Sequence, residues 1–343
     1  MKKSYVKVLA VVVLVYFLLG AGGASLQSAA FASPAPARTS PLRLSLGTAG
    51  LGGNLYVVGA TLCQIYNKYI QMAEFTPEVT GGSGVNVGLV HQKDVDLALC
   101  TNVAAYNGYN AKGWLEGEEP LHDVRTIAGL MPSALELFVL ASSNVYTIQD
   151  YNGKVMSAAT TGGGGDMTAR DLLPTLGINV GQKQDMTLPD VNSNLIDGLL
   201  DCAMDFGTFP HASRLELEAS VSTRFIELSP EEMKLMCDTF PYYYVGVIPG
   251  GSYRSIPAEG YKTIMSPNLL ICHKDLSEDL AYEMAKVLFD KIDELVTGSN
   301  SFSYVDRDSV LTATIPLHPG AIRYFKEQGY TIPDHLIPEE YVK

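Results

Sequence analysis

Residues 42–60 read LRLSLGTAGLGGNLYVVGA, and this stretch decides the fold class. Its first residues alternate leucine with polar side chains, as in a strand that buries one face. A glycine-rich turn follows at Gly47–Gly53, and a helix is expected over about Asn54–Ile70. A strand that leads through a loop into a helix is the unit of α/β proteins. The stretch therefore predicts a parallel sheet covered by helices.

The same unit follows directly and then restarts downstream. We expect a strand at Phe75–Thr80, a second glycine loop at Gly81–Gly84, a helix at about Val85–Lys93 and a strand at Val95–Cys100. Further along we expect a strand at Gly153–Ala159, a third loop at Thr160–Gly165 and a helix at Asp166–Leu176. Each loop follows the carboxyl end of a strand, which is where open α/β sheets bind ligands.

Later segments extend the pattern. A helix is expected at Leu195–Leu200 and a strand at Cys202–Phe206. Ser229 precedes proline and has glutamate three positions later, which predicts a capped helix start, and Ser277 precedes a helix expected to reach Leu295. A chain of 343 residues suggests about two domains. We expect the middle third to be a second α/β domain, inserted between the two halves of the first.

The N-terminus has the features of a secretory signal peptide over Met1–Ala32. Three early lysines precede the apolar run Val8–Leu19, which is short for a membrane span, and Ala30-Phe31-Ala32 fits a cleavage site. Residues 33–41 are then a linker. The mature chain is expected to be periplasmic or otherwise extracytoplasmic, with no membrane insertion after cleavage. The alternative is an uncleaved anchor.

The composition excludes one class of partner. The net charge is −13, and the first 32 residues hold three lysines and no acids, so the remainder carries −16. Such an acidic chain repels phosphate backbones, so we expect no nucleic-acid binding. The five cysteines, Cys63, Cys100, Cys202, Cys237 and Cys272, have no zinc-type spacing, and we expect buried thiols. One disulfide is the alternative.

The glycine loops do not match the dinucleotide fingerprint or the P-loop. Each nevertheless precedes an expected helix, whose first N–H groups and positive dipole end attract a small anion. The alternative for each loop is an ordinary tight turn. Arg170 could pair with an anion, with a solvated face or an interdomain pair as alternatives. Neutral hydrogen-bonding side chains lie in or beside the loops: Thr48, Asn54, Tyr56, Thr80, Ser83, Asn86 and Thr161.

No catalytic pattern is evident. None of the six histidines lies in His-Glu-x-x-His, and there is no Gly-x-Ser-x-Gly. We therefore expect no enzyme activity, no cofactor and no metal. An exported enzyme remains a minor alternative, with Asp205, His211 or Tyr244 in its cleft. Tyr242–Tyr244 could either line a cleft or pack a strand.

Several motifs resemble one receptor family. GTAGLGGNLYVVGA at 47–60, TGGSGVN at 80–86, IPGGSY at 248–253 and IPLHPGAIRYFKEQG at 315–329 are similar to segments of the TAXI solute receptors. These are the extracytoplasmic binding proteins of a class of tripartite ATP-independent (TRAP) transporters. The third loop departs from the family's common Gly-Ser-Gly-Thr-Glu, because Gly163 and Gly165 replace two hydroxyl residues and Asp166 replaces glutamate.

The resemblance implies a type II periplasmic-binding-protein fold, in which two α/β lobes close on a ligand. Lobe I would comprise 42–141 and 246–343 with the C-terminal helices, and lobe II 142–245. The crossings would lie near Leu137–Ala141 and Tyr243–Val247. The candidate ligand-binding residues are Thr48, Gly50, Leu51, Gly52, Asn54, Tyr56, Thr80, Gly81, Gly82, Ser83, Asn86, Thr161, Gly162, Gly163, Gly164, Gly165, Asp166, Thr208 and Phe209.

The resemblance also implies the partners. The ligand would be a small organic acid, such as a dicarboxylate, an oxo acid or an acidic amino acid. The receptor, a monomer, would deliver it to the TRAP membrane subunit without chemistry. A sensory receptor of the same fold is the alternative.

Overall fold

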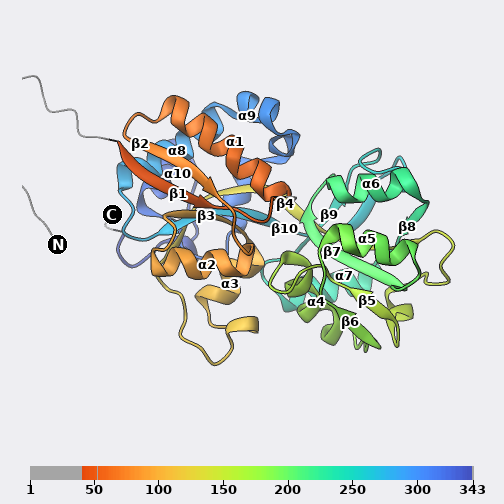
Figure 1. Ribbon diagram of the computed structural model, residues 1–343. Coiled ribbons are helices and arrows are strands. Elements are labelled where there is room, and N and C mark those ends of the chain that lie inside the picture. The colour runs from red at the N-terminus through yellow and green to blue at the C-terminus, as the bar shows by residue number, and fades with distance from the viewer. Residues whose placement is uncertain (1–40, 52, 342–343) are drawn as a thin grey trace, which may run out of the picture. The chain divides into compact units, whose positions relative to one another are not determined.

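The computed structural model describes residues 41–51 and 53–341, and within them one ten-stranded sheet runs in the order β2-β1-β3-β10-β4-β7-β5-β6 (Figure 1). Two further strands lie off this path, since β8 pairs with β4 and β9 with β10. The expected signal peptide, all but the last residue of the expected linker, and Gly52 lie outside the described residues.

The first strand set forms as the sequence predicts. β1 pairs in parallel with β2 on one side and with β3 on the other. Helices α1, α8 and α10 gather on one side of this set and α2 and α3 on the other (Figure 1). Its elements are β1 (Leu42–Gly47), α1 (Asn54–Tyr69), β2 (Ala73–Glu78), α2 (Ser83–Gln92), β3 (Leu97–Thr101) and α3 (Asn102–Tyr109).

The second strand set is also parallel, with β5 between β6 and β7. The helix expected at Leu195–Leu200 is wrong in position: α5 begins after Thr187 and ends at Ile196, and Gly198 with φ +71° turns the chain away. The set comprises β5 (Val155–Ser157), α4 (Gly164–Thr175), β6 (Gln182–Gln184), α5 (Leu188–Ile196), β7 (Cys202–Thr208) and α6 (Ala212–Ser220).

Two long antiparallel strands join the sets, so the sheet is mixed rather than wholly parallel as expected. They are β4 (Val124–Leu140) and β10 (Tyr261–His273), paired along much of their length. β10 changes partner from β9 (Tyr244–Ile248) to β3 between Met265 and Asn268. β4 passes from β10 to β7 at Ser133–Ala134, and β8 (Thr223–Phe225) pairs with its end.

These partner changes differ from the expected crossings near Leu137–Ala141 and Tyr243–Val247, the second of which lies in and beside β9. The sequence pattern shows where apolar strands lie but not which neighbour each strand meets along its length. The lobe boundaries themselves stay a prediction.

Two later helices, α7 and α8, follow the serines expected at their N-cap positions. Ser229 caps α7 (Pro230–Thr239) in a reciprocal capping box with Glu232. The helix expected behind Ser277 divides at Lys291 into α8 and α9, and Ser277 makes no side-chain cap bond. The bounds are α8 (Glu278–Asp290), α9 (Ile292–Gly298) and α10 (Pro319–Glu327).

The five cysteines are free thiols, as expected from their spacing in the sequence. Four of them are buried, and Cys237 is half-buried. Burial raises the pKa of the Cys63 thiol to about 12, so it stays protonated and unreactive. In the described part of the chain, no helix combines the length and the apolar character that crossing a bilayer requires.

Candidate functional site

The first two glycine loops leave neighbouring strands at one edge of the sheet. β1 and β2 are paired in register up to Gly47 and Glu78, so their loops start side by side. The backbone N–H and the Oγ1 hydroxyl of Thr48 donate to the Glu78 carbonyl at 2.9 and 2.7 Å. Thr80 Oγ1 donates to the Thr48 carbonyl at 3.1 Å. Thr48 and Thr80 therefore hold the two loops together.

Two further candidate residues are also used inside the fold. Asn86 Nδ2 donates to the carbonyls of Thr48 and Leu99, each at 2.7 Å. Ser83 Oγ accepts from the Thr101 N–H at 3.1 Å. Both side chains are buried, and Asn86 Oδ1 has no hydrogen-bond partner. These side chains therefore fix the positions of the loops and of the strands beside them.

The helices that follow these loops have uncompensated N-termini. α1 and α2 begin behind Gly53 and Gly82, with no side-chain cap and no acidic residue in the first turn. Gly82 has φ +96°, which a residue with a side chain rarely adopts. The first N–H groups of both helices thus have no side-chain acceptor and no nearby acid on their own helix. Gly50, Leu51 and Gly81 are exposed, and Leu51 keeps 71% of its surface.

The third loop is different, because it carries its own anion. Asp166, in the first turn of α4, accepts from the Gly162 N–H at 3.0 Å and from Arg170 Nε at 3.0 Å. Lys183 Nζ also donates to it. Burial alone would raise the pKa of Asp166, but these bonds outweigh it and hold the pKa below its ordinary value. Arg170 therefore forms an ion pair with Asp166 of its own helix.

The glycines of the third loop allow a close approach. A Cβ on Gly164 would lie 2.3 Å from the Phe206 carbonyl, and one on Gly165 would lie 2.6 Å from the Ala158 carbonyl. The start of α4 is thus pressed against the ends of β5 and β7. A side chain at either position would force this contact to open.

Loops from the two strand sets meet. A Cβ on Gly84 would lie 3.4 Å from the Gly162 carbonyl, 2.4 Å from Met167 Cε and 3.6 Å from the ring of Trp114. The Trp114 indole N–H is buried without a partner. The second and third loops therefore adjoin, with the chain's single tryptophan beside them.

Asn54 makes a second contact between the sets. Its Nδ2 donates to Thr208 Oγ1, at the end of β7, and to Ser301 Oγ at 2.9 Å. Phe209 is buried, with its ring edge-on to Tyr304 at 5.1 Å. Ser301 and Trp114 were missed from the sequence, because neither lies near a glycine loop in the chain.

The remaining candidates are less engaged. Tyr56 is half-buried on the first turn of α1. Thr161 is exposed, and its N–H donates to Asp185 Oδ1 at 2.7 Å. Whether any of the nineteen candidates contacts a ligand stays a prediction.

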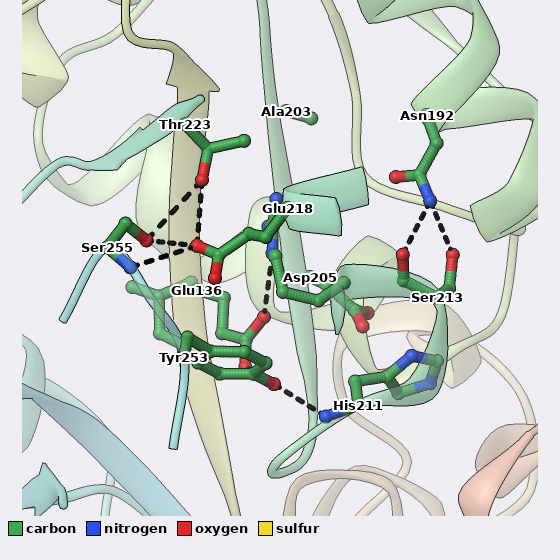
Figure 2. A network of polar contacts seen from close by, with 12 residues as sticks. Glu136, Asn192, Ala203, Asp205, His211, Ser213, Glu218, Thr223, Tyr253 and Ser255 are labelled. Atoms are coloured by element: carbon green, nitrogen blue, oxygen red, sulfur yellow. Dashed lines mark hydrogen bonds and ion pairs between the residues drawn. The ribbon is translucent and has the colours of Figure 1, made fainter. Parts of the chain in front are cut away.

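A buried polar network connects Glu136, Tyr253 and His211 (Figure 2). Glu136 of β4 accepts from Tyr253 Oη at 2.6 Å and lies 3.5 Å from Arg214 Nε of α6. Tyr253 Oη in turn accepts from the His211 N–H at 2.6 Å. Asp205 and His211 border a cavity of about 10 Å³ together with Glu136 and Arg214, which is room for about one water.

Of the three residues named for the alternative of an exported enzyme, only two lie close together. Asp205 and His211 share that cavity, whereas Tyr244 lies on β9. Tyr242 and Tyr243 are buried and both donate to Asp171 Oδ2, at 2.8 and 2.9 Å. The two rings therefore pack and hydrogen-bond, while Tyr244 is 39% exposed. The described residues hold no cluster of three or more His, Cys, Asp or Glu side chains suited to a metal.

Comparison with known proteins adds a family and a fold. The NMT1-like family model matches residues 46–329. Among solved structures, PhnD1 from Prochlorococcus marinus in complex with methylphosphonate is similar with a TM-score of 0.53 and 11% identity, over 78% of this chain and 93% of that one. A putative L-cystine ABC transporter protein from Listeria monocytogenes is similar with a TM-score of 0.50 and 12% identity, over 78% of this chain and 99% of that one. The predicted α/β fold of the type II periplasmic-binding-protein class, with two lobes, is confirmed.

Proposed function

The chain belongs to the NMT1-like family of periplasmic solute-binding proteins, and from this premise we propose that it captures a small organic anion and delivers it to a membrane transporter. The proposed ligand is a dicarboxylate, an oxo acid or an acidic amino acid. The ligand would lie between the glycine loops, and closure of the two lobes would enclose it.

One observation carries the choice of an anion. α1 and α2 point uncapped, acid-free N-termini at the edge where the first two loops lie. The third N-terminus is already neutralised by Asp166, so the first strand set would hold the negative group. PhnD1, of similar fold, is described with methylphosphonate, which is also a small anion.

The transporter class is the finer part of the proposal. The four TAXI-like motifs support a TRAP-type membrane subunit, which uses an ion gradient. The Listeria protein of similar fold is described as part of an ABC transporter, which makes an ATP-driven partner the alternative. A neighbouring gene for a permease without an ATPase would favour the first, and an ATPase gene the second. A neighbouring sensor kinase would favour the sensory role.

A thermal-shift screen tests the ligand class. The protein is unfolded and refolded to remove carried-over ligand, then melted with succinate, 2-oxoglutarate, L-glutamate, neutral amino acids and sugars. A ligand at about 100 times its Kd stabilises by about 2.7 kcal/mol. We expect a shift with one organic acid.

A matched ligand controls for the charge. Succinamide has the carbon skeleton of succinate without the charges, so it should give no shift if the helix N-termini hold a carboxylate. Equal shifts with both, or shifts only with sugars, would refute the anion proposal. Calorimetry on the best acid then gives its Kd.

A further inference from the structure

We propose that Tyr253 is a positioning residue for the candidate ligand site, because its hydroxyl holds the turn Thr208–His211 and so places Thr208 against Asn54. This inference rests on the proposed function, since Thr208 and Asn54 are candidate ligand-site residues.

The Tyr253 hydroxyl uses both of its capacities inside the protein. It donates to Glu136 Oε1 and accepts from the His211 backbone N–H, each at 2.6 Å (Figure 2). Tyr253 is 1% exposed, so water cannot replace either bond. His211 is the N-cap of α6, and its N–H is fixed by a side chain from a loop forty-two residues later in the chain. The IPGGSY motif thereby reaches the turn after β7.

The Tyr253 hydroxyl thus links Glu136 to His211, and the Glu136 end of this link is rigid. Glu136 lies within β4, directly opposite Asp205 of β7 in the sheet. Its second oxygen faces Arg214, whose guanidinium lies over the Phe138 ring at 2.9 Å. Both charged side chains are at most 4% exposed. The carboxylate is therefore a fixed anchor for the Tyr253 hydroxyl.

The His211 end of the link lies close to the first strand set, through Thr208 and Asn54. Thr208 is the last residue of β7, three positions before His211, and its Oγ1 accepts from Asn54 Nδ2. Hydrogen bonds weaken steeply with misalignment, so a small shift of this turn would break the contact with Asn54. Asn54 is in turn the first residue of α1, whose N-terminus is proposed to bind the ligand.

A separate tie in the same loop supplies a control. Glu218 of α6 accepts from the Arg254 N–H at 2.6 Å and from the Ser255 hydroxyl. Ser255→Ala removes a hydrogen bond from this loop but leaves the link from Glu136 through Tyr253 to His211 intact. Tyr253→Phe breaks that link while keeping the ring.

The first test needs no ligand. Hydrogen exchange, resolved to single amides, is compared in wild type, Tyr253→Phe and Ser255→Ala. We expect Tyr253→Phe to speed exchange at the His211 amide by about tenfold, as for one lost hydrogen bond with a buried partner. Ser255→Ala should leave exchange at this amide unchanged. Equal exchange in wild type and Tyr253→Phe would overturn the inference.

The wild type alone also tests the link, should Tyr253→Phe fail to fold. Ala212 and Ser213 start α6 and precede its first intrahelical N–H bond. The His211 amide should therefore exchange more slowly than either of them. A His211 amide that exchanges as fast would contradict the link.

The second test measures by calorimetry the binding of succinate, 2-oxoglutarate and L-glutamate. We expect Tyr253→Phe to weaken binding about five- to tenfold and Ser255→Ala to leave it unchanged. If Tyr253 acts through Thr208 and Asn54, Tyr253→Phe adds little further loss in an Asn54→Ala background. Equally large losses in both backgrounds would overturn that route. If none of the three acids binds wild type, the proposed function fails, while the exchange data still decide the inference.

Discussion

Two aspartates on α4 have opposite electrostatic surroundings. Asp166 accepts hydrogen bonds from the charged side chains of Arg170 and Lys183, and these hold its pKa below the ordinary value although burial acts to raise it. Asp171, one and a half turns later, meets only the hydroxyls of Tyr242 and Tyr243. Burial raises the pKa of Asp171 to about 6, and the two hydrogen bonds offset that only in part. The same residue type thus favours opposite charge states within one helix.

The raised pKa of Asp171 predicts a stability gain on neutralisation. The folded state binds this proton more tightly than the unfolded state, whose pKa is near 3.8. The stabilising effect is complete below about pH 4 and is lost as pH rises through 6, at a cost on the order of 3 kcal/mol. Asp171→Asn keeps an acceptor for both tyrosines and carries no charge. We expect it to melt higher than wild type at pH 8 and at a similar temperature at pH 4, by calorimetry.

Asp166→Asn is the matched control on the same helix. Its carboxylate stabilises the fold above about pH 4, and this effect is lost only as pH falls below that value. The variant should therefore be less stable than wild type at pH 8. If both variants shift stability in the same direction at pH 8, the assigned charge states are wrong.

At the scale of elements, the helix starts show how far local sequence decides structure. α7 begins with Ser229, Pro230 and Glu232, and the capping box forms as the pattern predicts. α8 begins behind Ser277 with acidic residues in its first turn, yet the Ser277 side chain makes no cap bond. Serine before a helix is therefore not sufficient, and the glutamate at the third position marks the working cap.

This contrast predicts unequal costs for one substitution. Ser229→Ala removes the hydroxyl that accepts from the Glu232 N–H, so we expect a loss of about 1 kcal/mol in urea unfolding. Ser277→Ala removes no such bond and should cost clearly less. Equal losses would contradict the assignment of Ser229 as the stronger cap.

Much of the element order follows from the sequence, for a physical reason. Alternation, glycine loops and helix starts are local signals, and they place β1, α1, β2 and β7 within a few residues. β4 and β10 are different, because their partners change along their length and most of these partners are distant in the chain. A local sequence pattern does not show which neighbour a strand pairs with, so these partner changes could not be predicted from the sequence.

At the scale of the whole molecule, the candidate site depends on contacts between distant segments. The glycine loops could be found from sequence, since glycine and helix starts are local. That Asn54 meets Thr208 and Ser301, or that Gly84 meets Met167, follows only from how the two strand sets meet. Asp166 shows the same point, because Lys183, which neutralises it, comes from β6.

A substitution at Gly84 tests how closely the second and third glycine loops pack. Gly84→Ala would place a methyl 2.4 Å from Met167 Cε and 3.4 Å from the Gly162 carbonyl, so the Met167 side chain must move away from the second loop. We expect about 1 kcal/mol lower stability in urea unfolding and weaker ligand binding, with partial recovery in Gly84→Ala/Met167→Ala.

Gly88→Ala in the same helix is the control for Gly84→Ala. No atom lies within 4 Å of its Cβ position, so it should be neutral or slightly stabilising. An equal loss from both substitutions would show that the effect lies in the helix and not in the contact.

The position of β10 has a consequence for when the protein can fold. β10 is synthesised after β3 and β4 but lies between them in the sheet. Until residue 273 has been made, one edge of each of these strands has no neighbour, and the first three strands cannot join the rest of the sheet. Such long-range pairing slows folding, because a long chain segment must be ordered before its contacts form. The first strand set can therefore join β4 and the second set only after β10, in the last third of the chain, has been made.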